Sequence, residues 1–553
     1  MKSWVCNGEA KYGKQYPNQN PPGSHEPYEN FGDDCVLCNL TREQVKGGSS
    51  SSGGGSFPVK GVAVVAATIL AIGVGTWGVL RECPEGKLYG VFCENSTPGP
   101  VPPGPEPMPG PVLPSSINDT NLRPGLYTWE PQRFSWGHQT LFPGNGSIPR
   151  DEGIEAFRKR DYQAAVDSFK RAVEGNRNDP EVLIFYNNAL ARQKGSPYTF
   201  ATVVPVGGRS KSAQEMLRGV AQAQNEFNAS GGLNGQLLEI VIANDGNAPE
   251  LATQVAEQIV NDDSVLGVIG HNSSDASEAG LAVYEKVGLP MISPTSTSTK
   301  LDGDVFFRTV PSDAAAAEKL AQYAWNEIDI SKTVIFYNPS SSFSSSLQSA
   351  FEEKFKELGG NSVSKDMTDP QLDAGIEVST AALEAQAEAI LLFPNTDYTS
   401  VAIELAKANS RLPQSRRMKL LGGDSLYSID TLTAGGESTE GLILPVAWFA
   451  GAAQFKDFSQ ASEQQWGGPV SWRTAASFDA TQAFIQALSE NATRVKVLEN
   501  LKQTNLSADE TSGQSFKFTP EGERGSDPVL VQVVRGSRNK VPGSNFGFEL
   551  LID

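Results

Sequence analysis

Apolar strands and amphipathic helices alternate from Tyr198 to the C-terminus of this chain. The run TFATVVPV has the pattern of a strand, SAQEMLRGVAQAQNEFNAS that of a helix, and LLEIVIAND that of the next strand. Strands separated by helices of about 10–15 residues are typical of parallel sheets that carry helices on both faces. Because roughly 350 residues exceed one comfortable hydrophobic core, we predict an α/β fold with two lobes and a cleft between them.

Two successive turns within residues 270–301 are rich in hydroxyl and amide groups. The strand VLGVIG is followed by a polar turn at residues 271–274, and the strand GLPMIS is followed by the hydroxyl-rich run at residues 294–297. Loops after neighbouring parallel strands converge at the carboxyl edge of the sheet, where a helix N-terminus suits an anion such as a carboxylate. The alternative is that these Ser and Thr residues are only helix N-caps.

Length, charge and missing motifs exclude several classes of function. The chain has 553 residues, which suits roughly two to four domains, and a formal net charge of −19. No basic stripe is visible, which argues against nucleic-acid binding as the main role. His138 and His271 are the only histidines after residue 46, and no cysteine follows Cys93. Because GxSxG, Walker A and HExxH motifs are also missing, we predict that the chain is not an enzyme.

Residues 61–80, GVAVVAATILAIGVGTWGVL, carry no charged side chain and lie between Lys60 and Arg81. A helix of about 20 residues covers the roughly 30 Å of bilayer hydrocarbon. Lysine and arginine are more frequent before this run than just after it. The positive-inside rule then predicts a single-pass protein of the cytoplasmic (inner) membrane, with a cytoplasmic N-terminus and a periplasmic or other extracytoplasmic C-terminal part. The alternative is a buried core helix.

The five cysteines fall on both sides of this apolar run. Cys35 and Cys38 form a CxxC motif, and Cys6 and His25 would complete a four-ligand structural zinc site. Unpaired cytosolic thiols are the alternative interpretation of these cysteines.

Cys83 and Cys93 lie after the apolar run, in CPEGKLYGVFC. In an oxidising compartment, this spacing predicts a small disulfide loop. Reduced thiols on the cytoplasmic side and a disulfide on the other side agree with the predicted orientation.

The rest of the N-terminal part divides by composition. We expect a Cys-containing unit, a flexible Gly/Ser linker, the apolar span, a Pro-rich extracytoplasmic stalk and a helical hairpin before the α/β domain. Their ranges are residues 1–46, 47–60, 61–80, 81–150, 151–196 and 197–553, respectively.

The segment 151–196 has apolar residues at helical spacing, among them Ile154, Phe157, Ala165 and Phe169. Its small and aromatic positions resemble one tetratricopeptide repeat. Stacked repeats normally need about three copies for a stable array, so a single copy must pack on the next domain or on a partner. A plain helical hairpin that serves as a spacer is the alternative.

The motifs of the C-terminal part are specific enough to indicate a family. NASGGLNGQLLEIVIANDGNAPELATQVAEQIV, VLGVIGH, GLPMISPTSTSTKL and FFRTVPSD occur in this order. They resemble the type I periplasmic binding proteins, and among these the leucine/isoleucine/valine-binding family of ABC transport. The resemblance covers about residues 198–553. It implies one lobe at about 198–313 with 444–515 and another at about 314–443 with 516–553, joined by three crossings of the chain.

The resemblance also implies a clamp for the α-carboxylate of an amino acid on the first lobe. Ser274 matches the serine that binds the ligand carboxylate after the GH turn. Thr295, Ser296 and Thr297 match the run that binds the carboxylate and the ammonium, partly through the backbone. Hydroxyls and helix-start amides satisfy a carboxylate that has left water.

Two residues of the second lobe would complete this clamp. Asp424 follows a glycine at a strand end and matches the acidic residue that pairs with the ligand ammonium, where the leucine-type proteins have Glu. Phe343, after YNPSSS, matches the aromatic residue that closes over the ligand.

The sequence departs from the family pattern where the side chain of the ligand would lie. FPNTDY offers Asn395 where the family often has a tyrosine, with Tyr398 displaced, and VGGRSKS places Arg209 near the cleft. The ligand is therefore either a branched-chain amino acid or a polar or acidic solute with Arg209 as its partner.

As a whole, the resemblance implies a membrane-anchored extracytoplasmic solute-binding protein. It would capture an amino acid or a related small polar solute and deliver it to an ABC permease, with no cofactor in the binding domain. The predicted span and the N-terminal Cys unit favour a second hypothesis, a sensor or scaffold that signals ligand binding across the membrane. A third reading, an adhesion scaffold without a ligand, would make the clamp residues coincidental.

Overall fold

The computed structural model describes residues 4–6, 28–30, 131–541 and 543–551. The chain divides into two compact units, residues 1–110 and 111–553, and each is considered by itself. In the first unit, β1 (Trp4–Cys6) and β2 (Tyr28–Asn30) pair antiparallel, with Cys6 opposite Tyr28.

Several predicted features lie outside the described residues. They are the linker at 47–60, the span at 61–80, the zinc candidates His25, Cys35 and Cys38, and the Cys83–Cys93 loop. Within the described ranges, no helix is long and apolar enough to cross a membrane.

The first lobe of the second unit is built on a six-stranded sheet with the order β3-β5-β4-β6-β7-β8. All neighbouring strands are parallel except the edge strand β3, which pairs antiparallel with β5. Its strands are β3 (Phe134–Ser135), β4 (Tyr198–Val204), β5 (Leu238–Asn244), β6 (Val265–Ile269), β7 (Met291–Ser293) and β8 (Phe306–Arg308). Its helices include α4 (Ser210–Ala229), α5 (Pro249–Val260), α6 (Ser274–Tyr284), α12 (Trp472–Ala487) and α13 (Arg494–Leu501).

The second lobe is built on a seven-stranded sheet with the order β10-β9-β11-β12-β13-β16-β17. The pairs from β10 to β13 are parallel, and β16 and β17 extend the sheet antiparallel. Its strands are β9 (Lys332–Tyr337), β10 (Asn361–Asp366), β11 (Ala389–Phe393), β12 (Lys419–Gly422), β13 (Ile443–Val446), β16 (Val529–Arg535) and β17 (Phe546–Leu550). Its helices are α7 (Asp313–Asn326), α8 (Ser342–Glu357), α9 (Ala374–Leu383) and α10 (Thr399–Arg411).

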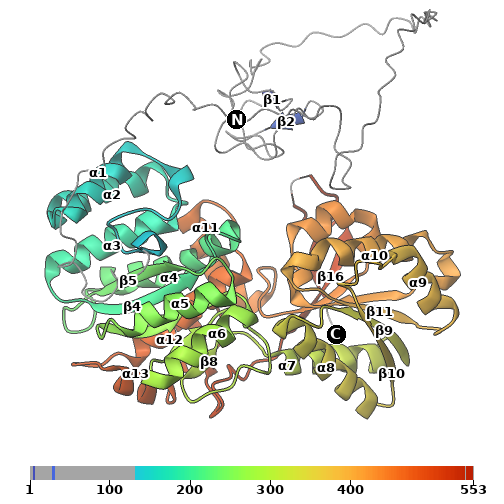
Figure 1. The fold of residues 1–553 in the computed structure, drawn as a ribbon. Helices are drawn as coiled ribbons and strands as arrows, with labels where there is room; N and C mark the ends of the chain where they lie inside the picture. Colours follow the sequence, from blue (N-terminus) through green and yellow to red (C-terminus); the bar gives the residue numbers. More distant parts are fainter. Residues whose placement is uncertain (1–3, 7–27, 31–130, 542, 552–553) are drawn as a thin grey trace, which may run out of the picture. The chain divides into compact units, whose positions relative to one another are not determined.

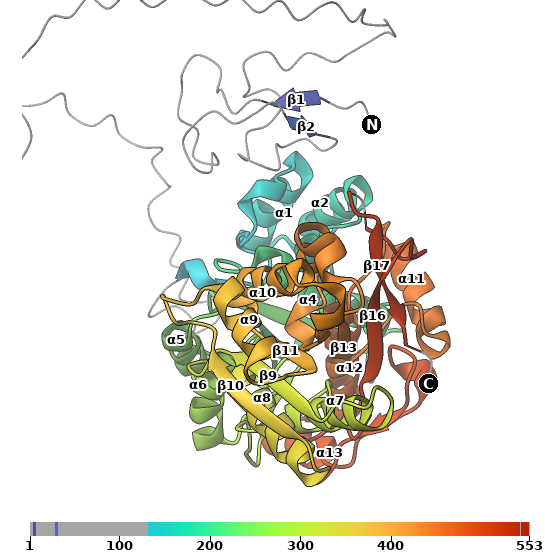
Figure 2. The same cartoon turned by 90° about the vertical axis from the view of Figure 1, so that its right-hand side faces the viewer.

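Side-chain alternation along the central strands explains why helices cover both faces of this sheet (Figure 2). Ile335 and Leu391 face a core with α7 and α8, whereas Val334 and Leu392 face the core that contains α9 and α10. A strand buried on both faces has a nearly continuous apolar sequence, which is the signal that predicted this architecture. The predicted two-lobed α/β fold with mainly parallel sheets is thus confirmed.

The second and third crossings between the lobes come later in the chain than the resemblance implied. β13 belongs to the second sheet, so the chain returns to the first lobe only after Val446. There α11 (Lys456–Trp466) leads into α12, and the short strands β14 (Asn505–Leu506) and β15 (Phe516–Lys517) pair antiparallel. Phe516 packs in the core of the first lobe, so the final crossing lies between β15 and β16. A short apolar run does not reveal which of two similar sheets it will join.

Three helices occupy the region of the predicted hairpin: α1 (Ile148–Arg158), α2 (Tyr162–Gly175) and α3 (Pro180–Lys194). Each begins with a side-chain cap, from Ser147, Asp161 and Asp179 respectively. A Cβ on Gly153 would lie 2.4 Å from the Phe169 ring, so a glycine allows α1 and α2 to approach closely. The resemblance to a tetratricopeptide repeat stays a prediction.

These helices pack on the first lobe (Figure 1). Phe157, Phe169 and Phe185 are buried in the same core as the strands of that lobe. On α3, the Asn188 amide donates to the carbonyl of Ile240 at 2.8 Å and accepts from its N–H at 2.9 Å. Asn188 therefore satisfies the backbone of β5 at a position that β3 does not cover.

The predicted stalk is wrong for its last residues. Residues 131–150 were assigned to a Pro-rich stalk, but β3 pairs with β5, and Phe134 and Trp136 are buried against the first lobe. The error arises because two strand residues carry no recognisable period.

Candidate functional site

A cavity of about 300 Å³ lies between the two lobes, at the carboxyl ends of strands from both sheets. The first lobe contributes the turns after β5, β6 and β7 and the start of α12. The second lobe contributes the turns after β9, β11 and β12. The lining residues are Asn247, Pro249, Asn272, Ser273, Ser274, Asp275, Thr295, Thr297, Ser340, Ser341, Phe343, Asn395, Thr396, Asp397, Asp424, Ser425, Trp472 and Arg473.

The wall on the first lobe contains the start of α6. Ser273 caps this helix by accepting from the Ala276 N–H at 3.3 Å. Ser274, the first helical residue, accepts from the Ser298 N–H at 3.4 Å and is 3% exposed. A helix N-terminus with a neighbouring hydroxyl attracts an anion, because its first N–H groups lack intrahelical acceptors. This wall can therefore bind a carboxylate.

The second hydroxyl run packs beside this turn, because β6 and β7 are neighbours in the sheet. The Thr295 hydroxyl donates to the carbonyl of Asn272 at 2.7 Å and to that of His271 at 3.1 Å. Thr295 and Thr297 line the cavity, as predicted for ligand-binding residues. Ser296 is not among the lining residues, and its hydroxyl forms a hydrogen bond of 2.7 Å with the Ser277 hydroxyl.

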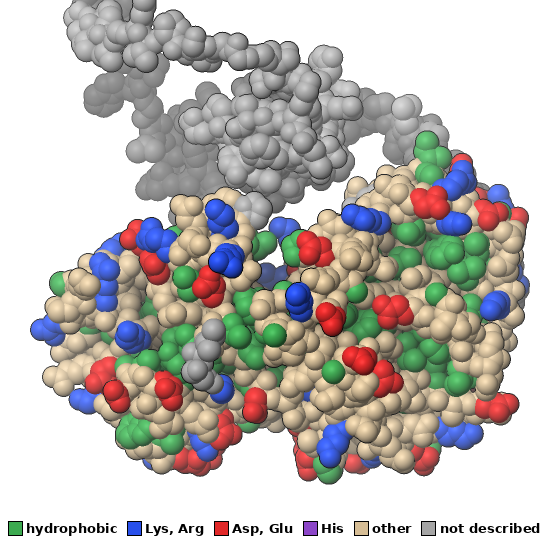
Figure 3. All heavy atoms as spheres, turned by 180° about the vertical axis from the view of Figure 1, so that it is seen from behind, with side chains coloured by type: hydrophobic (Ala, Val, Ile, Leu, Met, Phe, Trp, Pro, Cys, Tyr) green, Lys and Arg blue, Asp and Glu red, His purple; other side chains and the backbone are tan. Residues whose placement is uncertain are grey.

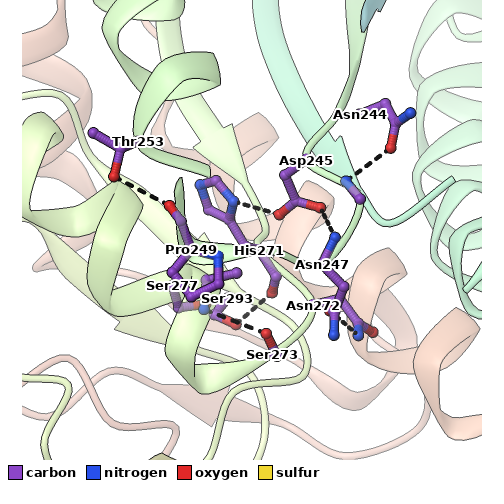
Figure 4. A network of polar contacts seen from close by, with 12 residues as sticks. Asn244, Asp245, Asn247, Pro249, Thr253, His271, Asn272, Ser273, Ser277 and Ser293 are labelled. Atoms are coloured by element: carbon purple, nitrogen blue, oxygen red, sulfur yellow. Dashed lines mark hydrogen bonds and ion pairs between the residues drawn. The ribbon is translucent and has the colours of Figure 1, made fainter. Parts of the chain in front are cut away.

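A buried network supports this wall from behind (Figure 4). His271 Nδ1 lies 2.8 Å from the Asp245 carboxylate, and Nε2 lies 3.1 Å from the Tyr284 hydroxyl. Burial raises the pKa of Tyr284, so its hydroxyl remains protonated at neutral pH. The other oxygen of Asp245 accepts from the Asn247 N–H at 2.9 Å. His271 thus packs behind the polar turns and positions them.

The facing wall on the second lobe carries the acidic group. Asp424 begins the short 3-10 helix η8 (Asp424–Leu426), directly after β12. Burial raises its pKa to about 6, although the positive charge of Arg473 and the Ser425 N–H lower it. A carboxylate that has lost water in this way gains from a ligand cation. Phe343 also lines this wall, close to Gly423, as predicted for a residue that contacts the ligand.

A second buried carboxyl lies behind the hydroxyl wall. The Asp313 N–H donates to the carbonyl of Thr297 at 2.7 Å, where α7 begins. Burial raises the pKa of Asp313 to about 7, although the hydroxyls of Thr297 and Ser346 lower it. Asp313 is not among the lining residues, and the negative charge of Asp424 also raises its pKa.

Arg209, a predicted ligand partner, pairs with a residue of the cavity lining. It lies at the start of α4 in the first lobe and forms an ion pair with Asp397 of the second lobe. Arg209 is not among the lining residues, but its partner Asp397 is, and the role of Arg209 as a ligand partner stays a prediction. Asn395 lines the cavity and accepts from the Asn338 amide at 3.1 Å. Tyr398 instead packs against the core of the second lobe that contains α9 and α10.

Further contacts between the lobes surround the start of α8. The Ser342 N–H donates to the Asp275 carboxylate at 2.8 Å, and its hydroxyl lies 2.9 Å from that of Ser298. Ser346 similarly contacts Thr299 at 3.0 Å. The lobes therefore meet through short polar side chains.

Trp472 and Arg473 were not among the predicted site residues, but they line the cavity from the start of α12. The guanidinium of Arg473 lies 4.5 Å from the centroid of the Trp472 ring. Its Nη1 donates to the Glu215 carboxylate at 3.4 Å. A Trp-Arg pair at the start of a helix matches no known motif, so the local sequence does not indicate that these two residues reach the cavity.

The site contains no recognisable metal centre. Across the described ranges, no group of three or more His, Cys, Asp or Glu side chains is placed to hold a metal ion. The hydroxyls and helix-start N–H groups of the first lobe instead face the Asp424 carboxylate of the second lobe across the cavity. This arrangement suits a zwitterionic solute.

Comparison with known proteins places the C-terminal part among solute-binding proteins. A sequence model of the family described as "Periplasmic binding protein" matches residues 197–539. The Leu/Ile/Val-binding protein of Escherichia coli is 26% identical over 328 residues, which cover 57% of this chain and 86% of that protein.

Solved structures show the same fold. A leucine-binding protein from Thermotoga maritima has a TM-score of 0.55 at 21% identity and covers 64% of this chain and 97% of its own. A substrate-binding protein of an ABC transporter from Desulfitobacterium hafniense, in complex with Leu, has a TM-score of 0.53 at 22% identity. The match covers 64% of this chain and 100% of that protein.

Proposed function

The chain belongs to the periplasmic binding protein family, and on that premise we propose that it captures an amino acid between its two lobes and delivers it to an ABC permease. The observation that carries this proposal is the opposition of charges across the cavity. Helix-start amides and hydroxyls of the first lobe face the partly buried carboxylate of Asp424 on the second.

The physical chemistry of a zwitterion explains why both walls are needed. Removing a carboxylate and an ammonium from water is costly unless each finds a partner. The start of α6, with Ser274 and Thr297, offers donors to the carboxylate. Asp424 offers an acceptor to the ammonium, and this ion pair relieves the desolvation that raises its pKa.

The mechanism that we propose is closure of the two lobes about the three connecting segments. The ligand would first bind the hydroxyl wall of the first lobe, which is held by its own hydrogen bonds. Asp424 and Phe343 would then close over it from the second lobe. Polar contacts between the lobes, such as Ser342 with Asp275, stabilise the closed arrangement.

The predicted membrane anchor belongs to the same proposal. A span at residues 61–80 would hold the binding domain at the outer surface of the cytoplasmic membrane. A disulfide between Cys83 and Cys93 would then lie outside, and a structural zinc held by Cys6, His25, Cys35 and Cys38 would lie inside. This topology also favours the second candidate function, a sensor that reports lobe closure to the cytoplasm.

The test is a thermal-shift screen of the full-length protein against the amino acids, small amides and urea, followed by calorimetry. A ligand that binds only the folded state raises its stability by about 2.7 kcal/mol at 100 times Kd. We expect one class of amino acid to raise the melting temperature, and Asp424→Asn to abolish the shift. Asp430→Asn, an exposed aspartate of the same lobe, is the matched control. No shift with any amino acid would contradict the proposal.

A further inference from the structure

Most of the residues that line the cavity are polar or charged. Among its lining residues, apolar side chains come from Pro249, Phe343 and Trp472, and the other side chains are polar or charged. Several of these polar side chains have partners within the protein, such as Asn272 with Asn247, but a leucine or isoleucine side chain would offer no partner to the charged side chain of Arg473. The ligand of this site should therefore offer polar groups beyond its α-amino and α-carboxylate groups.

The charged residues of the cavity differ in whether they already have partners. The Asp275 carboxylate accepts from the Ser342 N–H at 2.8 Å, and Asp397 pairs with Arg209. Under the proposed function, Asp424 pairs with the ligand ammonium. Arg473 is the only lysine or arginine in the part of the cavity lining that the structure describes. Among these described residues, Arg473 is therefore the positively charged member of the lining.

Arg473 is held in place but is poorly paired. Its side chain is 18% exposed and stacks on the Trp472 ring, which limits its freedom. The contact with the Glu215 carboxylate is 3.4 Å, longer than the 2.7–2.9 Å or so of a strong charge-assisted hydrogen bond. The Nε of Arg473 is buried without an acceptor. A planar carboxylate is the group that such a guanidinium binds best, because two parallel hydrogen bonds can form.

Binding of the ammonium makes a second anion more favourable. The charge of Arg473 acts on Asp424 before any ligand binds. An ammonium on Asp424 adds a second cation beside this guanidinium, and like charges at close range repel. A ligand that also carries a side-chain carboxylate offsets this repulsion, whereas a leucine side chain does not.

From these observations we infer that Arg473 recognises the ligand's side chain and that the ligand is an amino acid whose side chain ends in a carboxylate, such as glutamate or aspartate. This inference rests on the proposed function and specifies its ligand class. It replaces Arg209, which is paired at the edge of the site, with a guanidinium that lines the cavity. The competing interpretation is that Arg473 serves only as the counter-ion of Asp424.

The first experiment is calorimetry of the full-length protein with glutamate, aspartate, glutamine, asparagine, leucine and isoleucine. We expect an acidic amino acid to bind at least about tenfold more tightly than its amide and than leucine, because an ionic hydrogen bond is roughly twice as strong as a neutral one. Leucine, isoleucine or an amide that binds as tightly as the acidic amino acids would overturn the inference but leave the proposed function intact. A protein that binds none of the six would overturn the inference, and the thermal-shift screen of all the amino acids then decides whether the proposed function fails as well.

The second experiment separates side-chain recognition from a counter-ion role. Arg473→Gln should weaken binding of the acidic amino acid by about tenfold to a hundredfold and binding of its amide by less than about threefold. A counter-ion role would instead weaken both ligands by the same factor, and this outcome would overturn the inference. Arg416→Gln, an exposed arginine outside the cavity, is the matched control and should change neither affinity. Melting temperatures of all variants verify folding, and the wild-type ligand series tests the inference even if Arg473→Gln does not fold.

Discussion

The two walls of the cavity are built in different ways. The wall on the first lobe consists of helix-start N–H groups and of hydroxyls that are hydrogen-bonded within the lobe, as in the contact of the Thr295 hydroxyl with the Asn272 carbonyl. The wall on the second lobe carries Asp424, a carboxylate whose burial raises its pKa to about 6. The first wall is therefore arranged before a ligand arrives, whereas the second is left with a charge that a ligand can satisfy.

The lobes also differ in what covers their sheets. The first lobe carries the additional helices α1–α3 and the edge strand β3, which share its core. The second lobe ends its sheet with β16 and β17, a hairpin-like antiparallel extension. On the face of the molecule seen in Figure 3, basic and acidic side chains are interspersed over both lobes. The contrast shows that one lobe depends on a preceding segment for its core and the other does not.

The largest effect should follow from removing residues 131–197. Phe157, Phe169 and Phe185 would be lost from a shared core, and the backbone of Ile240 would lose Asn188. Each buried aromatic side chain contributes about 2–3 kcal/mol, so the sum is comparable with the total stability of a domain. We expect a fragment of residues 198–553 to be insoluble or unfolded by circular dichroism, and a fragment of residues 131–553 to melt cooperatively. Equal melting temperatures of the two fragments would show that α1–α3 are only a spacer.

Asp424→Asn should have the next largest effect, on affinity. Without the carboxylate, the ligand ammonium is buried without a counter-ion, which costs about 2–5 kcal/mol of binding free energy. Calorimetry should therefore show a Kd that is higher by a factor of about 30 or more. Asp430→Asn should leave the Kd unchanged, because this aspartate is exposed and outside the cavity. A Kd that changes less than threefold in Asp424→Asn would contradict the pairing of this carboxylate with the ligand ammonium.

The same variant should make the ligand-free protein more stable at neutral pH. The pKa of Asp424 is about 6 in the folded protein, above its ordinary value of 3.8, so the folded state holds this proton more tightly. Its contribution to stability is present below pH 3.8 and is lost as pH rises through about 6. We expect Asp424→Asn to raise the free energy of unfolding by about 2 kcal/mol at pH 7.5 and to have little effect near pH 4. Thermal melts across this range test it, and a stability gain at pH 4 would contradict the assigned direction.

Ser274→Ala should have a smaller effect on binding than Asp424→Asn. The variant removes one hydroxyl, but the N–H groups at the start of α6 remain for the ligand carboxylate. One neutral hydrogen bond contributes about 1 kcal/mol, which corresponds to a Kd about fivefold higher. Calorimetry with the ligand found in the screen measures this. A loss above a hundredfold would mean that the first wall depends on one side chain rather than on its helix start.

Arg209→Gln should have the smallest effect. The ion pair with Asp397 joins the lobes, but the Asp397 side chain is 63% exposed. Exposed ion pairs contribute about 0–1 kcal/mol and are weakened by salt. We expect the Kd to rise less than about fivefold at low salt and the difference from wild type to shrink at high salt. A large loss that salt does not reduce would indicate direct ligand contact by Arg209.

Most of the fold could be predicted from local patterns, and part of the site followed from them. The turns after β6 and β7 were expected to meet, and they do, because consecutive parallel strands are neighbours in the first sheet. Asp424 and Phe343 came from the family resemblance, and both line the facing wall. The ion pair between Arg209 and Asp397 could not be foreseen, because the position of Arg209 in the chain does not reveal that Asp397 lies beside it.

The sequence by itself determined the type of the elements and the kinds of groups that follow the strands. Apolar periodicity is a local property, so it could be read residue by residue for α4, β5 and their successors. Only the tertiary structure decided which segments share the cavity. Trp472 and Arg473 reach it although they lie far along the chain from Asn247, and the helices α1–α3 join the core of the first lobe. These outcomes depend on long-range packing, for which the local sequence carries no period and no motif.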